Sequence, residues 1–308
     1  MKTYDMIVIG GGPGGYTAAL YAVRAGLTAL VVEKLSAGGQ MALTHMIDNY
    51  PGFPEGVDGF ELGQRMQQQA ERFGAETALA EVQRLELTGP VKAVHTDSGT
   101  FYAKTVVIAT GADPRPLGLP EEGALRSRGI HYCAACDGMF YRGKTVVVVG
   151  GGNSAVADAL VLSRVAAKVI LVHRRDALRA SKVYHRSLAA AENVEFRWNS
   201  QVVRVLQDGK VVGVRLRDVE KGTETELACD GVFVSIGRAP ASALVAGQVA
   251  LDEGGYILAG ESTETSVPGV YAIGDVRTKA VRQVVTAVAD GAVAVHAAEE
   301  YLALGQGN

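Results

Sequence analysis

The sequence has 308 residues, about the length of two ordinary domains, and its 48% hydrophobic and 20% charged residues are typical of a globular chain rather than a disordered one. The formal charge of −3 argues against a nucleic-acid-binding surface spread over the whole protein. Glycine is unusually frequent, with 38 residues against 9 prolines, which fits neither a collagen-like nor a low-complexity pattern. We infer that bare backbone is needed at several places.

The N-terminal segment and the cysteines favour a cytoplasmic protein. Residues 1–10 hold too short an apolar run for a secretory signal, and no stretch approaches the length of a membrane span. Three cysteines, Cys133, Cys136 and Cys229, do not make a disulfide-stapled secreted scaffold. We therefore expect no membrane and no nucleic-acid partner, and a Cys-x-x-Cys pair that serves catalysis or binds a metal.

An internal repeat accounts for much of the glycine. Residues 7–34 reappear in register at 147–174, an offset of 140. Each copy predicts a buried strand, a glycine turn, an Ala/Leu-rich helix and a second strand, at 29–32 and 169–172. In a dinucleotide-binding turn of this kind, small residues let the backbone approach a pyrophosphate at a helix N-terminus. The small residues are Gly10, Gly12 and Gly15 in the first copy, and Gly150, Gly152 and Ala155 in the second.

The two copies differ where the second strand ends. The first copy has Glu33 there, and the second has His173-Arg174-Arg175. A carboxylate accepts hydrogen bonds from a ribose 2′-hydroxyl, whereas arginines suit a 2′-phosphate, so we expect one site for FAD or NAD and the other for NADP. Arg179, Lys182 and Arg186 extend the basic group, although a solvated helix start also explains the last two.

Later segments complete the two units. Two strand ends, 106–114 and 232–240, echo each other, and each closes one unit. A further buried strand at 269–275 precedes a long Ala/Val-rich helix at 282–303, and we expect this strand to return to the first unit because the second has already closed. The predicted fold class is α/β, with two nested Rossmann-like (three-layer ββα) dinucleotide-binding domains. Their boundaries are 1–113 with 241–308 for the outer domain and 114–240 for the inserted one.

The remaining segments predict covering elements, and meanders of this kind rarely carry chemistry. A strand pair broken at Gly89-Pro90, a three-stranded meander and an amphipathic helix account for them. Their predicted ranges are 77–87 and 92–102 for the pair, 202–206, 211–216 and 224–228 for the meander, and 60–73 for the helix.

The cysteine pair lies between the two nucleotide units. Cys133 and Cys136 can close a small disulfide ring, and this spacing often places the first thiol at a helix start, where its pKa falls. Such a pair can carry two electrons. Asp137 follows directly and can serve as a general acid for a departing thiolate, or simply cap a helix.

Two other interpretations of the cysteines stay open. A zinc site needs four ligands, and the sequence offers this pair, His131 and the remote Cys229. The pair can also be two inert buried cysteines, which is the interpretation we favour for Cys229. If the pair is redox-active, then a hydride from NADPH, a flavin and a dithiol on one chain define an electron relay.

In these motifs the chain resembles the low-molecular-weight, bacterial-type thioredoxin reductases, which are class II pyridine nucleotide-disulfide oxidoreductases. The resemblance covers essentially the whole chain, and the order of the motifs is more specific than any one of them. It depends on residues 10–15, 38–40, 49–52, 109–111, 133–138, 150–155, 173–176, 179–180, 274–275 and 282–283.

The resemblance implies FAD in the outer domain and NADPH in the inserted one, with no metal. For FAD it implies Gly10, Gly12, Pro13, Gly15, Glu33, Lys34, Gly39, Gln40, Asn49, Val82, Ala109, Thr110, Gly111, Asp275, Arg282, Gln283 and Val284. For NADPH it implies Gly150, Gly152, Asn153, Ser154, Ala155, His173, Arg174, Arg175, Arg179, Ile236, Gly237 and Arg238.

The resemblance also implies roles and partners. Cys136 faces the flavin, Cys133 attacks the disulfide of thioredoxin, and Asp137 is the acid. Family members are homodimers whose NADP domain rotates. Departures from the family pattern are Gly14, Ala135 and Ser181, of which Ala135 bears on redox poise or partner choice.

Four alternative functions stay open, and experiments can distinguish them. The first two are reduction of another thioredoxin-like or glutaredoxin-like partner and the use of another electron donor. The other two are a zinc-stabilised dinucleotide sensor and a dithiol oxidase that passes electrons to oxygen.

Overall fold

The computed structural model describes residues 2–44 and 46–305, apart from the side chains of residues 184, 185 and 189. Its contacts divide the chain into two compact units. The first comprises the residues up to Asp113 and those from Ala239 onward, and the second is Pro114–Arg238. The chain crosses between the units in β7 (Ala112–Pro114) and β16 (Arg238–Pro240), which pair with each other.

The first unit is built on a parallel sheet in the order β3-β2-β1-β6-β17. Its strands are nearly continuous apolar runs because both faces are covered. In β1, for example, Met6 and Val8 enter the core on one face, and Ile7 and Ile9 enter the core on the other. The bounds are β1 (Thr3–Ile9), β2 (Ala29–Glu33), β3 (Glu76–Leu79), β6 (Gly99–Ile108) and β17 (Val270–Ala272).

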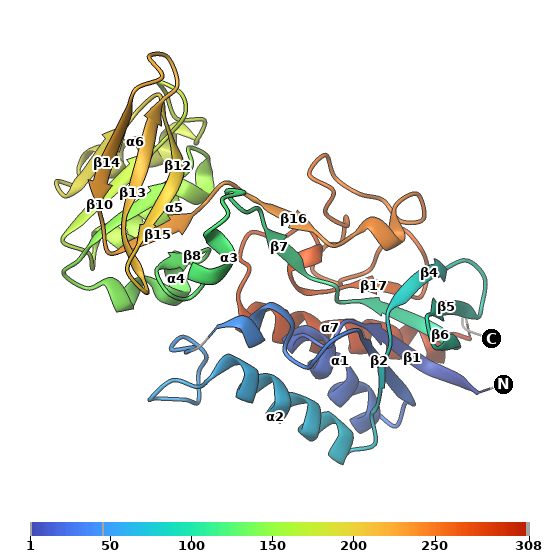
Figure 1. Cartoon of the computed structure of the whole chain (residues 1–308). Helices are drawn as coiled ribbons and strands as arrows, with labels where there is room; N and C mark the ends of the chain where they lie inside the picture. The colour runs from blue at the N-terminus through green and yellow to red at the C-terminus, as the bar shows by residue number, and fades with distance from the viewer. Residues whose placement is uncertain (1, 45, 306–308) are drawn as a thin grey trace. The chain divides into compact units, whose positions relative to one another are not determined.

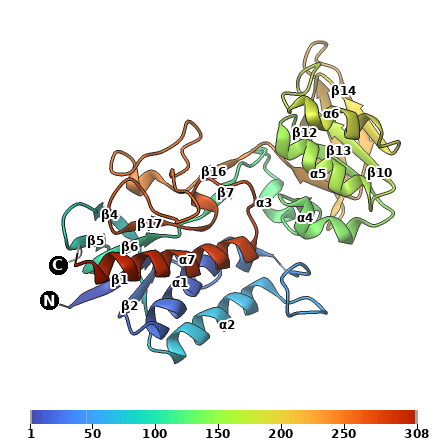
Figure 2. The ribbon, with the colours of Figure 1, turned by 180° about the vertical axis from the view of Figure 1, so that it is seen from behind.

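Helices cover one face of this sheet and strands cover the other. Figures 1 and 2 show α1 (Pro13–Arg24), α2 (Gly59–Arg72) and α7 (Val284–Ala303) side by side on the helical face. The second face carries β4 (Val82–Glu86) and β5 (Lys92–Thr96), which are antiparallel to each other, together with η3 (Ala243–Val245). The unit therefore has three layers.

The second unit repeats the design. Its parallel sheet has the order β11-β10-β9-β15-β8, with α5 and α6 on one face and the antiparallel meander β12-β13-β14 on the other. The strands are β8 (Ile130–His131), β9 (Thr145–Val149), β10 (Lys168–Val172), β11 (Val194–Arg197), β12 (Ser200–Gln207), β13 (Val211–Asp218), β14 (Glu224–Ala228) and β15 (Gly231–Val234). The α-helices are α3 (Glu122–Leu125), α4 (Ala134–Asp137), α5 (Asn153–Ser163) and α6 (Lys182–Ala189).

The predicted α/β class with two Rossmann-like units is confirmed. β1, α1 and β2 correspond to β9, α5 and β10 at the predicted offset, and the order β3-β2-β1-β6 corresponds to β11-β10-β9-β15. The fifth parallel strands differ, because β17 follows the other strands of its sheet along the chain whereas β8 precedes those of its own. The segment at 269–275 supplies β17, which pairs in parallel with β6 of the first unit. The meander and the helix at 60–73 are confirmed within a few residues.

The predicted strand pair of 77–87 with 92–102 is confirmed for β4 and β5, on either side of Gly89-Pro90, but each predicted segment contains two strands and not one. β3 pairs in parallel with β2, and only after a turn does β4 begin its antiparallel pairing with β5. The Ala80 N–H still donates to Glu33 O at 2.9 Å, so this residue stays with β2 while the chain turns. A second turn after Thr96 starts β6, which runs on into the centre of the sheet. Alternating apolar residues predict a strand but do not reveal its partner.

The described part of the chain contains no helix that is both long and apolar enough to cross a membrane.

Candidate functional site

The first glycine turn joins β1 to α1 and leaves open space at its middle. A Cβ atom at Gly10 would lie 2.5 Å from Ala109 O, and one at Gly15 would lie 2.0 Å from Gly10 O, so packing within the protein requires both glycines. Gly12 is different, because its φ of −76° suits any residue and no described atom lies within 4 Å of the Cβ position. The open space faces the start of α1, where helix amides attract an anion.

The second turn, between β9 and α5, has the same construction. Gly150 has φ +149°, and a Cβ atom there would lie 2.4 Å from Ser235 O. Gly152 has φ −95°, and within the described structure nothing lies within 4 Å of its Cβ position. Ala155 is buried at the third place, and Asn153 accepts the Ser181 N–H at 2.8 Å. Both turns therefore fit a phosphate group outside the protein.

The strand ends beside the turns carry opposite charges. Glu33 accepts the N–H groups of Gly11 at 2.7 Å and Leu35 at 3.0 Å. In the second unit the His173 ring takes the place of this carboxylate. A Cβ atom at Gly151 would lie 2.2 Å from the ring. Gly11 in the first turn is thus packed against Glu33, and Gly151 in the second turn is packed against His173. These two strand-end residues distinguish the two copies.

His173 lies in a strongly basic, buried position. Its side chain is only 5% exposed, and its Nε2 atom has no hydrogen-bond partner among the described residues. Burial lowers the pKa of His173, and the charges of Arg179, Arg175 and Arg174 lower it further. A buried polar atom without a partner is rare in proteins. Together, the orphan nitrogen and three guanidinium groups fit the 2′-phosphate of NADP.

The other residues expected around FAD mostly follow parallel strands of the first unit at their carboxyl ends. The Ala109 N–H donates to Ile9 O at 2.8 Å, and the Thr110 hydroxyl donates to Ala241 O at 2.7 Å, which holds the end of β6 in place. Lys34 is exposed directly after β2, Gly111 follows β6, and Asp275 follows β17 within η4 (Gly274–Val276). Val82 is an exception, because it begins the antiparallel strand β4.

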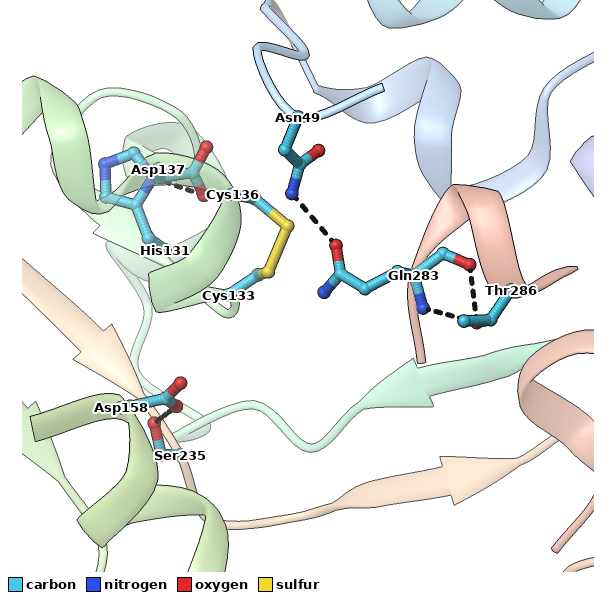
Figure 3. The surroundings of a disulfide bond; sticks show 9 residues. All are labelled: Asn49, His131, Cys133, Cys136, Asp137, Asp158, Ser235, Gln283 and Thr286. Atoms are coloured by element: carbon cyan, nitrogen blue, oxygen red, sulfur yellow. Dashed lines mark hydrogen bonds and ion pairs between the residues drawn. A yellow bond between two sulfur atoms is a disulfide. The ribbon is translucent and has the colours of Figure 1, made fainter. Parts of the chain in front are cut away.

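The remaining residues that we expect around FAD are joined by hydrogen bonds from their side chains within this unit. Asn49 Nδ2 donates to Gln283 Oε1 at 3.0 Å (Figure 3), and Gln283 is the N-cap of α7, which Val284 begins. Gln40, in η1 (Gly39–Leu43), donates to Asp113 Oδ1 at 2.5 Å. Arg282 Nε donates to Asp275 O at 3.3 Å, which links the two segments that the resemblance places beside FAD.

In the second unit, Ser154 lies in the first turn of α5, and Ile236 and Gly237 follow β15. Gly237 has φ +106°, and its carbonyl accepts the Arg115 N–H at 3.0 Å. Arg238 begins β16. This turn therefore also lies beyond the carboxyl end of a parallel strand, beside the turn that ends β9.

A buried charge cluster that the sequence did not suggest holds the Gly274-Asp275 turn to α7. Asp290 accepts hydrogen bonds from Gly274 N–H at 2.8 Å, from Arg277 at 2.8 and 3.0 Å, and from Lys279 at 2.7 Å. All three charged side chains are less than 10% exposed. The sequence does hold one signal for this cluster, because Asp290 is a single acidic residue in an otherwise apolar stretch of α7.

Replacing Asp290 with alanine is expected to destabilise the protein by about 3–5 kcal/mol, because Arg277 and Lys279 would remain buried without a counter-charge. The shift in the urea unfolding midpoint measures this. Glu299→Ala, an exposed change on the same helix, is the matched control and should stay within about 0.5 kcal/mol of the wild type. Equal effects of the two variants would contradict a stabilising role for the cluster.

The same cluster predicts a pH dependence. Burial alone would raise the pKa of Asp290, but hydrogen bonds from Arg277 and Lys279 outweigh it and lower the pKa. Its contribution to stability should therefore be present above the unfolded-state pKa of about 3.9 and be lost as the pH falls through the depressed folded value.

The cysteine pair forms a disulfide at the start of a short helix. Cys133 is the N-cap of α4 (Ala134–Asp137), its Cα atom lies 5.3 Å from that of Cys136, and the two sulfurs are bonded (Figure 3). Asp158 of α5 accepts hydrogen bonds from the Ser235 hydroxyl at 2.5 Å and from the Ala134 N–H, which holds the start of α4. A thiolate formed at Cys133 would face helix amides that stabilise it.

Asp137 does not cap α4 but belongs to a chain of polar groups. Its Oδ2 atom lies 3.0 Å from His131 Nδ1, and His131 Nε2 lies 2.7 Å from the Tyr141 hydroxyl. The sequence suggested His131 only as a ligand in the zinc alternative. Among the described residues no group of three or more His, Cys, Asp and Glu side chains could hold a metal ion.

Cys229 lies apart from this pair in the core of the second unit, and burial raises the pKa of its thiol to about 12. Only about one such thiol in 10⁴ is ionised at pH 8. After reduction, iodoacetamide at pH 8 should therefore label Cys133 and Cys136 in the folded protein, and Cys229 only after denaturation, as read by peptide mass spectrometry. Fast native labelling of Cys229 would contradict its burial.

Comparison with known proteins agrees with this geometry. The family model for pyridine nucleotide-disulphide oxidoreductases matches residues 4–291. The chain is 46% identical over 301 residues to a thioredoxin reductase of Mycolicibacterium smegmatis, with 97% of each protein covered. It is 46% identical over 302 residues to the bifunctional thioredoxin reductase/thioredoxin of Mycobacterium leprae, covering 97% of this chain and 66% of that protein. A solved thioredoxin reductase from Streptococcus pyogenes has a TM-score of 0.92 at 43% identity, covering 98% and 99%.

Proposed function

The chain belongs to the pyridine nucleotide-disulphide oxidoreductase family, and we propose that it is an NADPH-dependent, FAD-containing thioredoxin reductase that works through Cys133 and Cys136. The observation that carries the proposal is the combination found in the second unit. A disulfide at a helix start shares this unit with an open glycine turn and a basic strand end. The first unit adds a second open turn whose strand end is acidic.

The two turns are assigned to two different cofactors by charge. Glu33 would repel a 2′-phosphate and can hold a ribose hydroxyl, so the first turn is assigned to FAD. His173, Arg174, Arg175 and Arg179 would balance a 2′-phosphate, so the second turn is assigned to NADPH. When bound, NADPH would supply a hydride and FAD would pass its two electrons to a disulfide.

The chain's own residues carry the exchange with the partner protein. As a thiolate, Cys133 attacks one sulfur of the partner disulfide, that S–S bond breaks, and the departing sulfur takes a proton. Cys136 then loses its proton and attacks Cys133 Sγ. This restores the enzyme disulfide and releases the second partner sulfur, which also takes a proton. Asp137, directly after Cys136, is the proposed acid for a departing thiolate of the enzyme.

Thioredoxin is the proposed partner because the relatives are named for it, and one of them carries thioredoxin on the same chain. A cytoplasmic homodimer without nucleic-acid or membrane partners is part of the same proposal. The closest alternative within the class is another thioredoxin-like or glutaredoxin-like protein as the electron acceptor.

Anaerobic reduction tests the donor and then the acceptor. The purified protein should be yellow and free of zinc, and NADPH should bleach the flavin much faster than NADH. Adding oxidised thioredoxin should then produce continuous NADPH oxidation, and a panel of thioredoxin-like proteins identifies the preferred partner. Equal bleaching by both nucleotides, or none by either, would contradict the proposal. A colourless zinc protein would indicate the sensor alternative, and oxygen consumption with dithiols alone would indicate an oxidase.

A further inference from the structure

We propose that His131 is a positioning residue for the thiol chemistry, sharing one titrating proton with Asp137 while Tyr141 fixes the orientation of its ring. This proposal rests on the proposed function in one respect: it takes Cys133 and Cys136 to be the working dithiol. It adds a proton-holding pair where a single carboxyl was expected.

The geometry leaves His131 one orientation. Its Nδ1 atom lies 3.0 Å from Asp137 Oδ2 and its Nε2 atom lies 2.7 Å from the Tyr141 hydroxyl, so both ring nitrogens are in use (Figure 3 shows the first contact). The ring stacks on Phe233 with centroids 5.2 Å apart and meets the edge of the Tyr141 ring at the same separation. The imidazole is 8% exposed and the carboxyl 17%, so solvent reaches the pair mainly at its Asp137 end.

These contacts determine where protons sit. Burial, with the charge of Asp137, raises the pKa of Tyr141, so the phenol keeps its hydrogen and donates it to Nε2. The hydrogen of a neutral imidazole then lies on Nδ1 and is donated to the Asp137 carboxylate. A further proton is held by the pair as a unit, either on the imidazole or on the carboxyl.

Reduction of the Cys133–Cys136 disulfide would use the proton that the His131–Asp137 pair holds. When a dithiol reductant reduces the enzyme disulfide, its thiolate bonds to one enzyme sulfur and the enzyme S–S bond breaks. The other sulfur leaves as a thiolate, and the electrons come from the reductant. The proton of the His131–Asp137 pair passes to the departing sulfur of Cys136, and the pair is reloaded from solvent through the exposed part of Asp137.

Other ionisable groups around the pair come from three places: the turn before β15, the turn before β9 and helix α5. Cys229 and Asp230 act on Tyr141 from the turn before β15, Lys144 Nζ lies 5.4 Å from the Tyr141 ring, and Asp158 contacts α4 from α5. The pKa of Cys229 is about 12, and Asp230 accepts the Thr145 N–H at 2.9 Å. These groups stay unchanged in the variants below, so a change in the pH profile reports on the pair.

The variant His131→Asn distinguishes a proton-sharing role of His131 from a merely structural role. In His131→Asn, the side-chain amide can donate to Asp137 as Nδ1 does, but it cannot hold an additional proton. Tyr141→Phe keeps the ring and removes only the hydroxyl. His296→Asn, a change of an exposed histidine on α7, is the matched control.

The test is the alkylation rate of the dithiol against pH. The holoprotein is reduced with dithiothreitol and freed of it, then treated with iodoacetamide between pH 5 and 9, and labelling of Cys133 and Cys136 is read by mass spectrometry. We expect the wild type and His296→Asn to show two inflections, one from the pair and one from a thiol. His131→Asn should lose the lower inflection and react about tenfold more slowly near pH 6, because Asp137 then stays negative beside the forming thiolate.

Profiles that superimpose for His131→Asn and the wild type would overturn the proposal, as would a single inflection in the wild type. If His131→Asn does not fold, Tyr141→Phe is decisive: it should shift the lower inflection, and an unchanged one would overturn the proposal. Thioredoxin and NADPH take no part, so the result stands or falls separately from the proposed function. Conversely, failure to reduce any thioredoxin would refute that function without changing these profiles.

Discussion

Replacing Cys136 with serine is expected to leave reduction of the flavin by NADPH intact and to lower thioredoxin reduction by about 10⁴-fold or more, since the reaction then lacks one of its two nucleophiles. The change alters one sulfur atom, and the serine hydroxyl cannot close a disulfide with Cys133. Neither glycine turn contains this residue, and the basic strand end lies elsewhere in the second unit. Stopped-flow bleaching and a coupled thioredoxin assay measure the two halves of the relay separately.

Two controls make the Cys136→Ser result specific. Cys133→Ser should lose thioredoxin reduction equally, because the same disulfide is missing. Cys229→Ala should keep it, because this third cysteine is a buried core residue away from the pair. Substantial thioredoxin reduction by Cys136→Ser would refute the relay, and a loss of flavin bleaching would show that the serine disturbs more than the disulfide.

The repeat, the two glycine turns and the charge difference between Glu33 and His173 could be predicted because each is written in neighbouring residues. A strand, a turn and a helix follow one another in the chain, and the fingerprint places a ligand at their junction. The structure adds what depends on packing across a unit: close contacts within the protein require Gly10, Gly15 and Gly150, whereas the space beside Gly12 and Gly152 stays open for a ligand.

The His131–Asp137–Tyr141 chain could not be predicted in the same way. His131 ends β8, Asp137 ends α4 and Tyr141 ends η2 (Gly138–Tyr141), so no helical or strand period relates the three positions. Their meeting depends on where Phe233 and β15 place the β8 edge. The Asp290 cluster likewise joins α7 to a turn earlier in the chain, and the split of the predicted strand at 77–87 depends on which neighbour each half pairs with.

Replacing both Arg174 and Arg175 with alanine is expected to raise the KM for NADPH by about 10²–10³-fold and to leave that for NADH nearly unchanged. Each guanidinium would make a charge-assisted hydrogen bond to the 2′-phosphate worth about 1.5–3 kcal/mol, and each 1.4 kcal/mol is about tenfold in affinity. NADH lacks this phosphate, so it loses only the general attraction of the basic surface. Steady-state kinetics with both nucleotides measures the ratio.

A second double variant distinguishes direct contact with the 2′-phosphate from the general attraction of positive surface charge. Lys182→Ala with Arg186→Ala also removes two positive charges, but from exposed positions along α6 rather than from the strand end that surrounds His173. If the strand end binds the phosphate, this variant should change the KM for NADPH only a few-fold and in a salt-dependent way. Binding of 2′,5′-ADP against AMP gives the same comparison without turnover. Equal effects of the two variants, or an equal rise for NADH, would refute the assignment, because the preference for NADPH would then come from the field of the surface and not from this strand end.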